Sequence, residues 1–347
     1  MIRVTRNCPW NKCVFCNTYR EERFEYRSVD EVKEDIDAAK NISDELRAAS
    51  WKLGLGGSIS DDVVRFLVRN KPEIYGRDHV GAEAFNVRLQ SLVNTANWLV
   101  SGGRTVFLQD ADTLIMRTPE LVEVIKYLKQ TFPTIERVTS YARSKTAARK
   151  PIEELKELRL AGLSRLHIGL ESGSDDVLEF IQKGVTAADH IDGGKKIVES
   201  GISLSEYVIP GIGGRKWSQV HATETARVVN EINPDFIRLR SLIVREGTDL
   251  NTKFQSGEFE PPTEDEIVAE LRVFIGNLEC NSYLVSDHMA NLLWELEGTL
   301  PEAKASLLKT IDDYQAMPLE RRLDFRLKRR LRSHLSAHGG IDGGLNE

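Results

Sequence analysis

The sequence is poor in cysteine, has no long apolar run and carries no excess of positive charge. It contains four cysteines, and no second cysteine cluster follows the first. No apolar run reaches the length of a membrane span and no basic-then-apolar leader is present, so we expect a cytoplasmic protein with no membrane partner. The net charge of −6, from 47 basic and 53 acidic residues, argues against a general nucleic-acid-binding surface.

Three of the four cysteines are clustered near the N-terminus. Cys8, Cys13 and Cys16 have the spacing C-x4-C-x2-C, and Phe15 directly precedes the third. A short apolar run comes before them and a helical pattern of apolar residues follows. The cysteines therefore lie on a loop that leaves a strand, which is where α/β folds place their chemistry.

Three clustered thiols have several interpretations. A disulfide pair with one remaining thiol is disfavoured, because no leader indicates an oxidising compartment. A structural zinc site needs four ligands, and Cys280 or a histidine would have to supply the fourth. An iron–sulfur cluster held by three thiolates leaves one iron open for a substrate or cofactor, and we favour it. Inert packing is poorly supported by three cysteines within nine residues.

Strand and helix patterns alternate through the first 250 residues. This alternation predicts an α/β fold with a parallel sheet, a partial (β/α)6 TIM-like barrel. A helical insertion is expected at about 48–103, within a barrel domain over 1–250. The expected strands are 2–5, 105–108, 137–142, 165–170, 202–209 and 236–244.

The chain changes character after residue 250. We expect a mainly helical extension over 251–337, which would supply a lid, and a flexible glycine-rich tail over 338–347. The predicted helix 319–335 has leucines at a spacing of four and arginines on its other faces. Contact with RNA phosphate is one interpretation of the arginines. A solvated face of a packing helix is favoured, because no aromatic residues interleave the charges.

Polar residues recur where the predicted strands end. Because the carboxyl ends of barrel strands share one rim, these residues should face the cysteine loop. Carboxylates, arginine and glycine turns suit a zwitterionic nucleoside. The rim residues are Gln109, Asp110, Asp112, Ser140, Arg143, Glu171, Ser172, the turn 210–214 with Pro210, Arg238 and Arg240. His288 is a further candidate to face the site, against a packed or surface role.

The cysteine loop resembles that of the radical S-adenosylmethionine (SAM) enzymes, whose pattern is C-x3-C-x-aromatic-C. Cys13-Val14-Phe15-Cys16 fits the second half, whereas the first gap is one residue longer. The stretch from Ile168 to Ser174, with Lys183 and Gly184, is similar to the branch of the Elongator catalytic subunit, the methylthiotransferases and the oxygen-independent coproporphyrinogen oxidases.

The resemblance implies roles for particular residues. Cys8, Cys13 and Cys16 would ligate a [4Fe-4S] cluster, and Phe15 would line the adenine of SAM. Glu171 and Ser172 would contact its ribose or methionyl part, with Ser140 on the same rim. Arg143 would bind the SAM carboxylate, and Arg240 is a further cofactor-binding candidate on the rim. Residues 109–112 stand where many relatives have Gly-Gly-Glu, which holds the ammonium, so Gln109, Asp110 or Asp112 would take that role. The turn 208–213 with Pro210 would flank the adenine.

The implied activity is that of a radical SAM oxidoreductase. Such an enzyme cleaves SAM reductively and uses the 5′-deoxyadenosyl radical to abstract hydrogen from a substrate, which the sequence does not identify. Expected partners are a small-molecule substrate and an electron donor such as flavodoxin or ferredoxin. Two alternatives are a radical SAM enzyme acting on tRNA and a zinc-stabilised, non-enzymatic binding protein. Thr18 stands where coproporphyrinogen oxidases have a further cysteine, so that activity is not transferred.

Overall fold

The computed structural model describes residues 2–338, and only the backbone for 332–338. The chain forms two compact units. The first unit comprises the residues up to Arg6, Glu25–Ser140 and Glu157–Ser164, and the second comprises Asn7–Phe24, Tyr141–Lys156 and the chain from Arg165 onward. The expected tail over 338–347 lies outside the described residues, apart from the backbone of His338.

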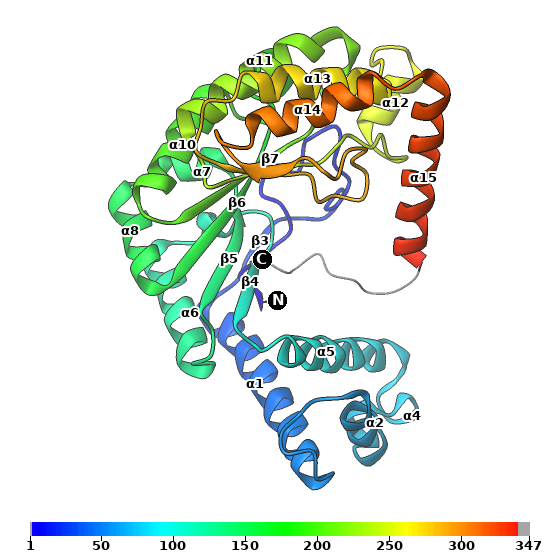
Figure 1. Cartoon of the computed structure of the whole chain (residues 1–347). Helices are drawn as coiled ribbons and strands as arrows, with labels where there is room; N and C mark the ends of the chain where they lie inside the picture. The colour runs from blue at the N-terminus through cyan, green and yellow to red at the C-terminus, as the bar shows by residue number, and fades with distance from the viewer. Residues whose placement is uncertain (1, 339–347) are drawn as a thin grey trace. The chain divides into compact units, whose positions relative to one another are not determined.

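The first unit holds the opening strands, a group of helices and two parallel pairings (Figure 1). β1 pairs with β4, and β4 pairs with β5, both parallel. β2 and β3 form a separate antiparallel pair. The elements are β1 (Ile2–Arg3), β2 (Thr5–Arg6), β3 (Glu25–Tyr26), α1 (Val29–Lys52), α2 (Asp61–Asn70), α3 (Pro72–Tyr75), α4 (Arg77–Val80), α5 (Ala82–Val100), β4 (Thr105–Gln109), η1 (Thr113–Ile115), α6 (Thr118–Thr131) and β5 (Arg137–Ala142).

The helical insertion has a small core of its own. Buried apolar residues of α2 and α5 pack against the C-terminal part of α1, in a cluster that includes Leu46, Leu67 and Leu92. Helix α1 runs on to Lys52 without interruption, and the bounds of the insertion at about 48–103 stay a prediction. The long helix is explained by its amphipathic pattern and by a capping box, in which Ser28 and Glu31 satisfy each other's backbone amides.

The second unit continues the strand–helix alternation. β6 pairs with β7, β7 with β8 and β8 with β9, all parallel, whereas β10 is antiparallel to β9. The elements are α7 (Ser144–Arg149), α8 (Ile152–Ala161), β6 (Leu163–Glu171), α9 (Asp175–Phe180), α10 (Ala187–Glu199), β7 (Ser203–Val208), α11 (Gly214–Ile232), β8 (Phe236–Leu239), α12 (Asp249–Gln255), α13 (Glu264–Gly276), β9 (Tyr283–Val285), β10 (Glu297–Thr299), α14 (Lys304–Gln315) and α15 (Leu319–His338). The division between the units passes through β5, α8 and β6.

The predicted fold class is confirmed. The sheet is predominantly parallel, helices follow its strands, and the described residues form no closed barrel. The predicted strand over 236–244 was too long, because β8 ends at Leu239. Pro210 follows the end of β7 and accepts from the N–H of Leu242 at 3.0 Å, but it has no backbone N–H to donate in return, so regular pairing ends there. The domain boundary at residue 250 stays a prediction, although β9 from beyond it pairs with β8.

Helix α15 packs by the face that the sequence did not favour. Its leucines Leu319, Leu323, Leu327 and Leu331 are each more than half exposed. The side chains of Arg326 and Arg329 are only 15% and 12% exposed, and they pair with Asp265 and Glu295. Arg326 and Arg329 therefore lie on the packed face, which corrects the expectation for these two residues, whereas Lys328 and Arg330 are exposed as expected.

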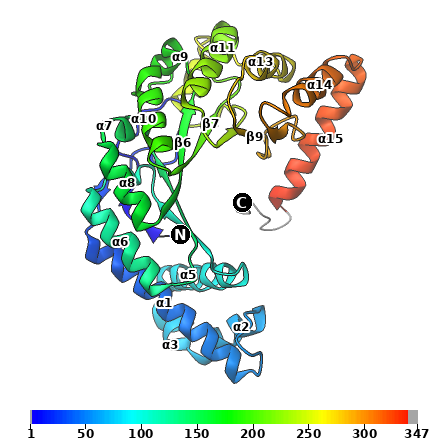
Figure 2. The ribbon, with the colours of Figure 1, turned by 60° about the vertical axis from the view of Figure 1, so that its left-hand side comes forward.

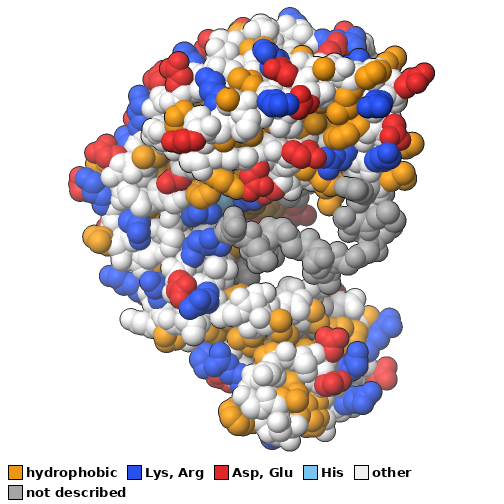
Figure 3. All heavy atoms as spheres, in the orientation of Figure 1, with side chains coloured by type: hydrophobic (Ala, Val, Ile, Leu, Met, Phe, Trp, Pro, Cys, Tyr) orange, Lys and Arg blue, Asp and Glu red, His pale blue; other side chains and the backbone are white. Residues whose placement is uncertain are grey.

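Charge is mixed over the surface that Figure 3 draws, where Lys and Arg side chains are interspersed with Asp and Glu. This pattern agrees with the nearly balanced counts of basic and acidic residues. Within the described part of the chain, no helix is both long and apolar enough to span a membrane.

Candidate active site

The cysteine loop, residues 7–24, is held in the second unit by its buried centre. The backbone N–H of Val14 donates to the carbonyl of Ile181 at 3.0 Å, and the Val14 carbonyl accepts from Leu250 at 2.8 Å. The Val14 side chain is fully buried in an apolar cluster, against which Phe15 packs. Cys13 and Cys16 are one and two residues from this anchor, so their positions are fixed by packing rather than by local structure.

The long first gap of the cysteine motif is accommodated by a left-handed residue. Asn11 has a φ of 49°, a conformation that asparagine adopts more readily than most residues. Its side-chain amide donates to the carbonyls of Tyr19 and Glu22, and its backbone N–H points to the Cys8 sulfur at 3.4 Å. Asn11 therefore closes the loop between the first two cysteines.

The three thiols are free and half-buried. Burial raises the pKa of the Cys13 thiol to about 11, while the positive charges of Lys183 and Arg143 act in the opposite direction. Among the described residues, no three His, Cys, Asp or Glu side chains converge on a point that could hold a single metal ion. A [4Fe-4S] cluster differs in this respect, because each thiolate binds a separate iron. The donor set of three thiols on one anchored loop fits such a cluster.

Trp10 links the cysteine loop to the turn after α9. Its indole N–H donates to the carbonyl of Gln182 at 2.7 Å. The Arg143 guanidinium lies 5.1 Å from the centre of the Trp10 ring and donates to the carbonyl of Lys183 at 2.8 Å. Gly184 has a φ of +72° and leaves room for the indole. The loop and the turn are therefore one interlocked structure, with the predicted residue Arg143 between them.

Glu171 and Lys183 form an almost buried ion pair at 2.7 Å. Burial alone would lower the pKa of Lys183, but the charges of Glu171 and Cys13 outweigh it and the pKa is raised. Glu171 has a φ of 61°, and its carboxylate lies where a side chain on Gly169 would stand. Lys183 therefore stays charged between a carboxylate and the cysteine loop.

Ser172 is buried and bonded within the protein. Its hydroxyl lies 2.8 Å from Nδ1 of His221 and accepts from the N–H of Ser174 at 3.1 Å. His221 also lies 3.6 Å from a carboxylate oxygen of Glu270. Burial lowers the pKa of His221 to about 4, so the histidine is neutral at pH 7 and this contact is not an ion pair.

Glu270 organises the turn after β7. Its carboxylate accepts from the N–H of Gly211 at 2.7 Å and from the Ser218 hydroxyl at 2.6 Å. Burial raises the pKa of Glu270 to about 7, against the effect of these two hydrogen bonds. The predicted residue Pro210 is buried and precedes the turn that Glu270 holds. A residue of α13 thus shapes the predicted adenine-flanking segment.

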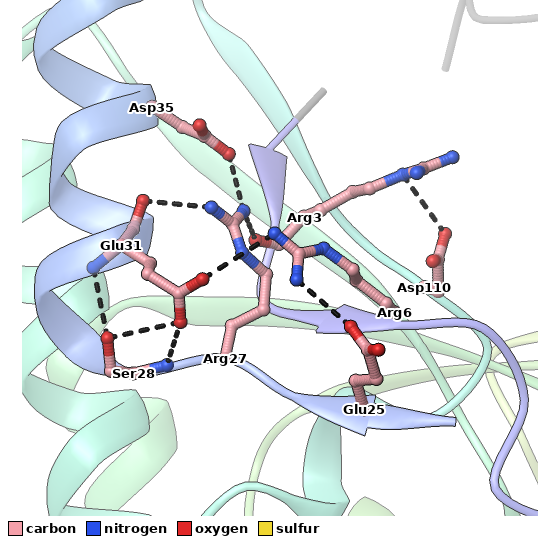
Figure 4. A network of polar contacts seen from close by, with 8 residues as sticks. All are labelled: Arg3, Arg6, Glu25, Arg27, Ser28, Glu31, Asp35 and Asp110. Carbon is pink, nitrogen blue, oxygen red and sulfur yellow. Dashed lines mark hydrogen bonds and ion pairs between the residues drawn. The ribbon is translucent and has the colours of Figure 1, made fainter. Parts of the chain in front are cut away.

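Four predicted residues, Gln109, Asp110, Asp112 and Ser140, belong to the first unit. Figure 4 shows Asp110 beside Arg3, whose Nε is 3.7 Å from the buried carboxylate. Asp112 is fully buried, and the Ser140 hydroxyl donates to the carbonyl of Leu108 at 2.8 Å.

Arg27 joins the opening strand to α1 in the same view. It donates to the carbonyl of Arg3 at 2.8 Å and pairs with Asp35 at 2.5 Å (Figure 4). The strand that leads to the cysteine loop is therefore fixed by a nearly buried guanidinium.

The second unit contains the other predicted residues. Arg240 pairs with Asp287 at 2.5 Å, and its guanidinium lies 4.9 Å from the Tyr207 ring centre. Burial lowers the pKa of His288, the neighbour of Asp287, which keeps this histidine neutral. The site assignments themselves stay predictions.

The sequence analysis did not identify several residues that hold or surround the site. Trp10 stands inside the cysteine motif, and Lys183 was noted only as part of a similar stretch. Asp287 directly precedes His288, which the sequence analysis names as a candidate to face the site. This neighbourhood could have pointed to Asp287 as well. Glu206 in β7 gave no signal, although it is fully buried with no hydrogen-bond partner among the described residues. Burial raises the pKa of Glu206 well above its usual value.

Comparison with known proteins finds a family model that matches part of the chain. The profile of the radical SAM superfamily matches residues 76–225, a range that does not include the cysteine loop. A tRNA uridine(34) acetyltransferase of Methanocaldococcus jannaschii is 26% identical over 117 residues, which are 33% of this chain and 22% of that protein. The corresponding enzyme of Methanocaldococcus infernus is 25% identical over the same shares. The chain thus matches about a fifth of the length of these curated relatives.

Solved structures with a similar fold include Elp3 of Methanocaldococcus infernus, with a TM-score of 0.48 and 13% identity over 66% of this chain and 59% of that one. Coproporphyrinogen III oxidase of Escherichia coli has a TM-score of 0.40 and 16% identity over 50% and 40% of the two chains. The match over residues 76–225, which is less than half of the chain, supports a radical SAM enzyme whose substrate is not identified. The cofactors of this family are a [4Fe-4S] cluster and SAM.

Proposed function

We propose that Cys8, Cys13 and Cys16 hold the [4Fe-4S] cluster and that the chain uses it to cleave SAM reductively. One observation carries this proposal: the three free thiols lie on a loop anchored beside Lys183, Arg143 and Glu171. When bound, the reduced cluster and SAM supply a 5′-deoxyadenosyl radical that abstracts hydrogen from a substrate. An electron donor such as flavodoxin or ferredoxin would deliver the electron.

The residues around the loop have distinct tasks in this proposal. A cluster with three thiolates is negatively charged, so Lys183 and Arg143 stabilise it and favour the ionised thiols. Arg143 also suits the carboxylate of SAM, because a guanidinium binds carboxylates through two hydrogen bonds. Glu171, now paired with Lys183, suits the ribose hydroxyls. Phe15 and the turn with Pro210 supply apolar surface that excludes water.

The proposal is tested by comparing two cysteine variants. The full chain is reconstituted anaerobically with iron and sulfide, reduced with dithionite and given SAM. We expect brown protein that forms 5′-deoxyadenosine. Cys13→Ala should lose the cluster and the product, whereas Cys280→Ala should keep both, because Cys280 is buried away from the motif. Equal iron content in the two variants, or colourless protein that holds zinc, would overturn the assignment.

A second candidate is a radical SAM enzyme that acts on tRNA. It is favoured by the names of two curated relatives, each matched over about a fifth of its length. The basic helix α15 gives this candidate little support, because Arg326, Arg329 and Arg330 are paired with acidic residues. Strongly salt-dependent tRNA binding that weakens when these arginines are neutralised would favour it. Unchanged affinity would count against it.

A further inference from the structure

The strands of the second unit present two different faces. Side chains alternate along a strand, and the registers align Ile168 with Glu206, Ile237 and Leu284. This row is fully buried. Figures 1 and 2 both draw α10 and α11 along one side of β6 and β7. The alternate row contains Tyr207 and Arg238, which are partly exposed, and His167, which is buried.

Three rings form a continuous aromatic row across neighbouring strands. Tyr141 at the end of β5 lies 5.9 Å from His167 in β6, measured between ring centres. His167 is stacked on Tyr207 in β7 at 5.4 Å, with an angle of 22° between the rings. Tyr141 is 39% exposed and His167 only 6%, so the row is open to a ligand at the Tyr141 end. Such rings offer a flat apolar surface on which a planar group can stack.

Two guanidinium groups continue the row beyond Tyr207. Arg240 lies 4.9 Å and Arg238 lies 5.9 Å from the centre of the Tyr207 ring. Both arginines pair with the single carboxylate of Asp287. The side chain of Arg238 is 22% exposed and that of Arg240 is 25% exposed. The two guanidinium groups carry one positive charge more than Asp287 neutralises, and little water surrounds that charge.

The arginine pair also has unused hydrogen-bonding capacity. The Nε of Arg238 is buried and has no hydrogen-bond partner among the described residues. The nearby histidine, His288, is neutral, because burial and the charge of Arg240 lower its pKa. A second anion beside Asp287 would balance the charge of the two guanidinium groups.

We propose that Tyr141, His167, Tyr207, Arg238 and Arg240 bind a substrate with a planar ring and a negatively charged substituent, a carboxylate or a phosphate. The ring would stack along the aromatic row and the anion would meet the arginines. Tyr207 is in register with Gly169, two residues before Glu171 on β6. The site is therefore next to the residue proposed for SAM. This inference rests on the proposed function, because it names the substrate class of the same enzyme.

The test measures binding of simple probes to the full, reconstituted chain by isothermal calorimetry. Naphthoate and naphthyl phosphate carry both features and distinguish the two anions. Naphthamide keeps the ring without the charge, and cyclohexanecarboxylate keeps the charge without the planar ring. We expect one of the two anionic naphthalenes to bind with a dissociation constant of about 1 mM or tighter. The amide and the cyclohexane should bind about tenfold more weakly.

Variants connect this binding to the named residues. Arg240→Gln and Tyr207→Leu should each weaken binding of the anionic naphthalene by about tenfold. Tyr207→Phe keeps the ring and removes the hydroxyl that bonds to Arg238 and Tyr141, so it should bind the probe more tightly than Tyr207→Leu, which separates stacking from misfolding. Arg272→Gln is the matched control, since Arg272 pairs with Asp312 on an exposed surface.

Three results would overturn the inference: no binding of either anionic probe, equal binding of naphthamide, or equal loss in Arg272→Gln. Formation of 5′-deoxyadenosine is measured on the same samples. Product without probe binding would remove this inference alone. Probe binding without product would remove the proposed cluster chemistry alone.

Discussion

At the scale of single residues, the cysteine loop depends on a glycine outside it. Gly184 has a φ of +72°, and a Cβ there would lie 2.2 Å from the Trp10 ring. Trp10 holds the loop against the turn after α9 and supports Arg143. The loop geometry is therefore sensitive to one methyl group placed 174 positions away from Trp10 in the chain, which no local pattern in the cysteine motif would indicate.

We predict that Gly184→Ala lowers the free energy of unfolding and the iron content together. Gly201→Ala is the control, because Gly201 has a similar φ of +79° but nothing within 4 Å of a Cβ. Both changes impose the left-handed strain of about 1–2 kcal/mol. The clash with Trp10 should add about 1–3 kcal/mol at Gly184 alone. Urea unfolding and iron analysis check this; equal losses in both variants would show that Trp10 does not transmit the effect.

At the scale of elements, α15 shows how far an amphipathic pattern can mislead. A leucine stripe normally marks the packed face of a helix. Here the stripe is exposed, and the helix is held instead by arginines that reach acidic residues at the start of α13. Arg326 is the centre of this contact, since it meets Asp265, Glu264 and the hydroxyl of Tyr314.

Arg326→Gln should therefore destabilise the attachment of α15 by about 1–3 kcal/mol, because Asp265 loses a nearly buried partner. Lys328→Gln, on the same helix, removes a 69% exposed side chain that pairs with Asp324. Its effect should stay within about 0.5 kcal/mol. Hydrogen exchange of α15 amides, measured with thermal unfolding, distinguishes the two. Similar protection in both variants would contradict an anchoring role for Arg326.

At the scale of the whole molecule, the His221–Glu270 pair sets two opposite pH dependences of stability. Glu270 keeps its proton to a pKa of about 7 when folded, against 4.5 in the unfolded chain, so its contribution to stability is lost as pH rises through that window. His221 has a folded pKa of about 4 against 6.5 unfolded, so its contribution is lost as pH falls through that window. The two contributions to stability have opposite signs and largely cancel where the two pH windows overlap.

Single variants should reveal the pH dependence that each of the two residues contributes. Relative to the unaltered chain, Glu270→Gln should gain about 3 kcal/mol of unfolding free energy from pH 4.5 to 7, because it removes the loss that Glu270 contributes. Relative to the unaltered chain, His221→Asn should lose about 3 kcal/mol from pH 4 to 6.5, because it removes the gain that His221 contributes. Urea unfolding at a series of pH values measures both. Parallel profiles in the two variants would refute the assignment.

The sequence by itself determined what depends on short-range pattern. Apolar periodicity predicted the alternation of strands and helices, including the strands 105–108 and 137–142, because neighbouring residues decide which faces are buried. The cysteine spacing predicted a shared loop, since thiols three to eight residues apart cannot separate far. The class of chemistry followed from these local features.

Only the tertiary structure decided which side chains meet. The contacts between Trp10 and Gly184, between Arg240 and Asp287, and between Arg326 and Asp265 join residues far apart in the chain. Their partners are chosen by packing and by the cost of leaving a buried charge unpaired, which no local window contains. The same cost reversed the face on which α15 packs, because α13 presents carboxylates where an apolar surface would have bound the leucines.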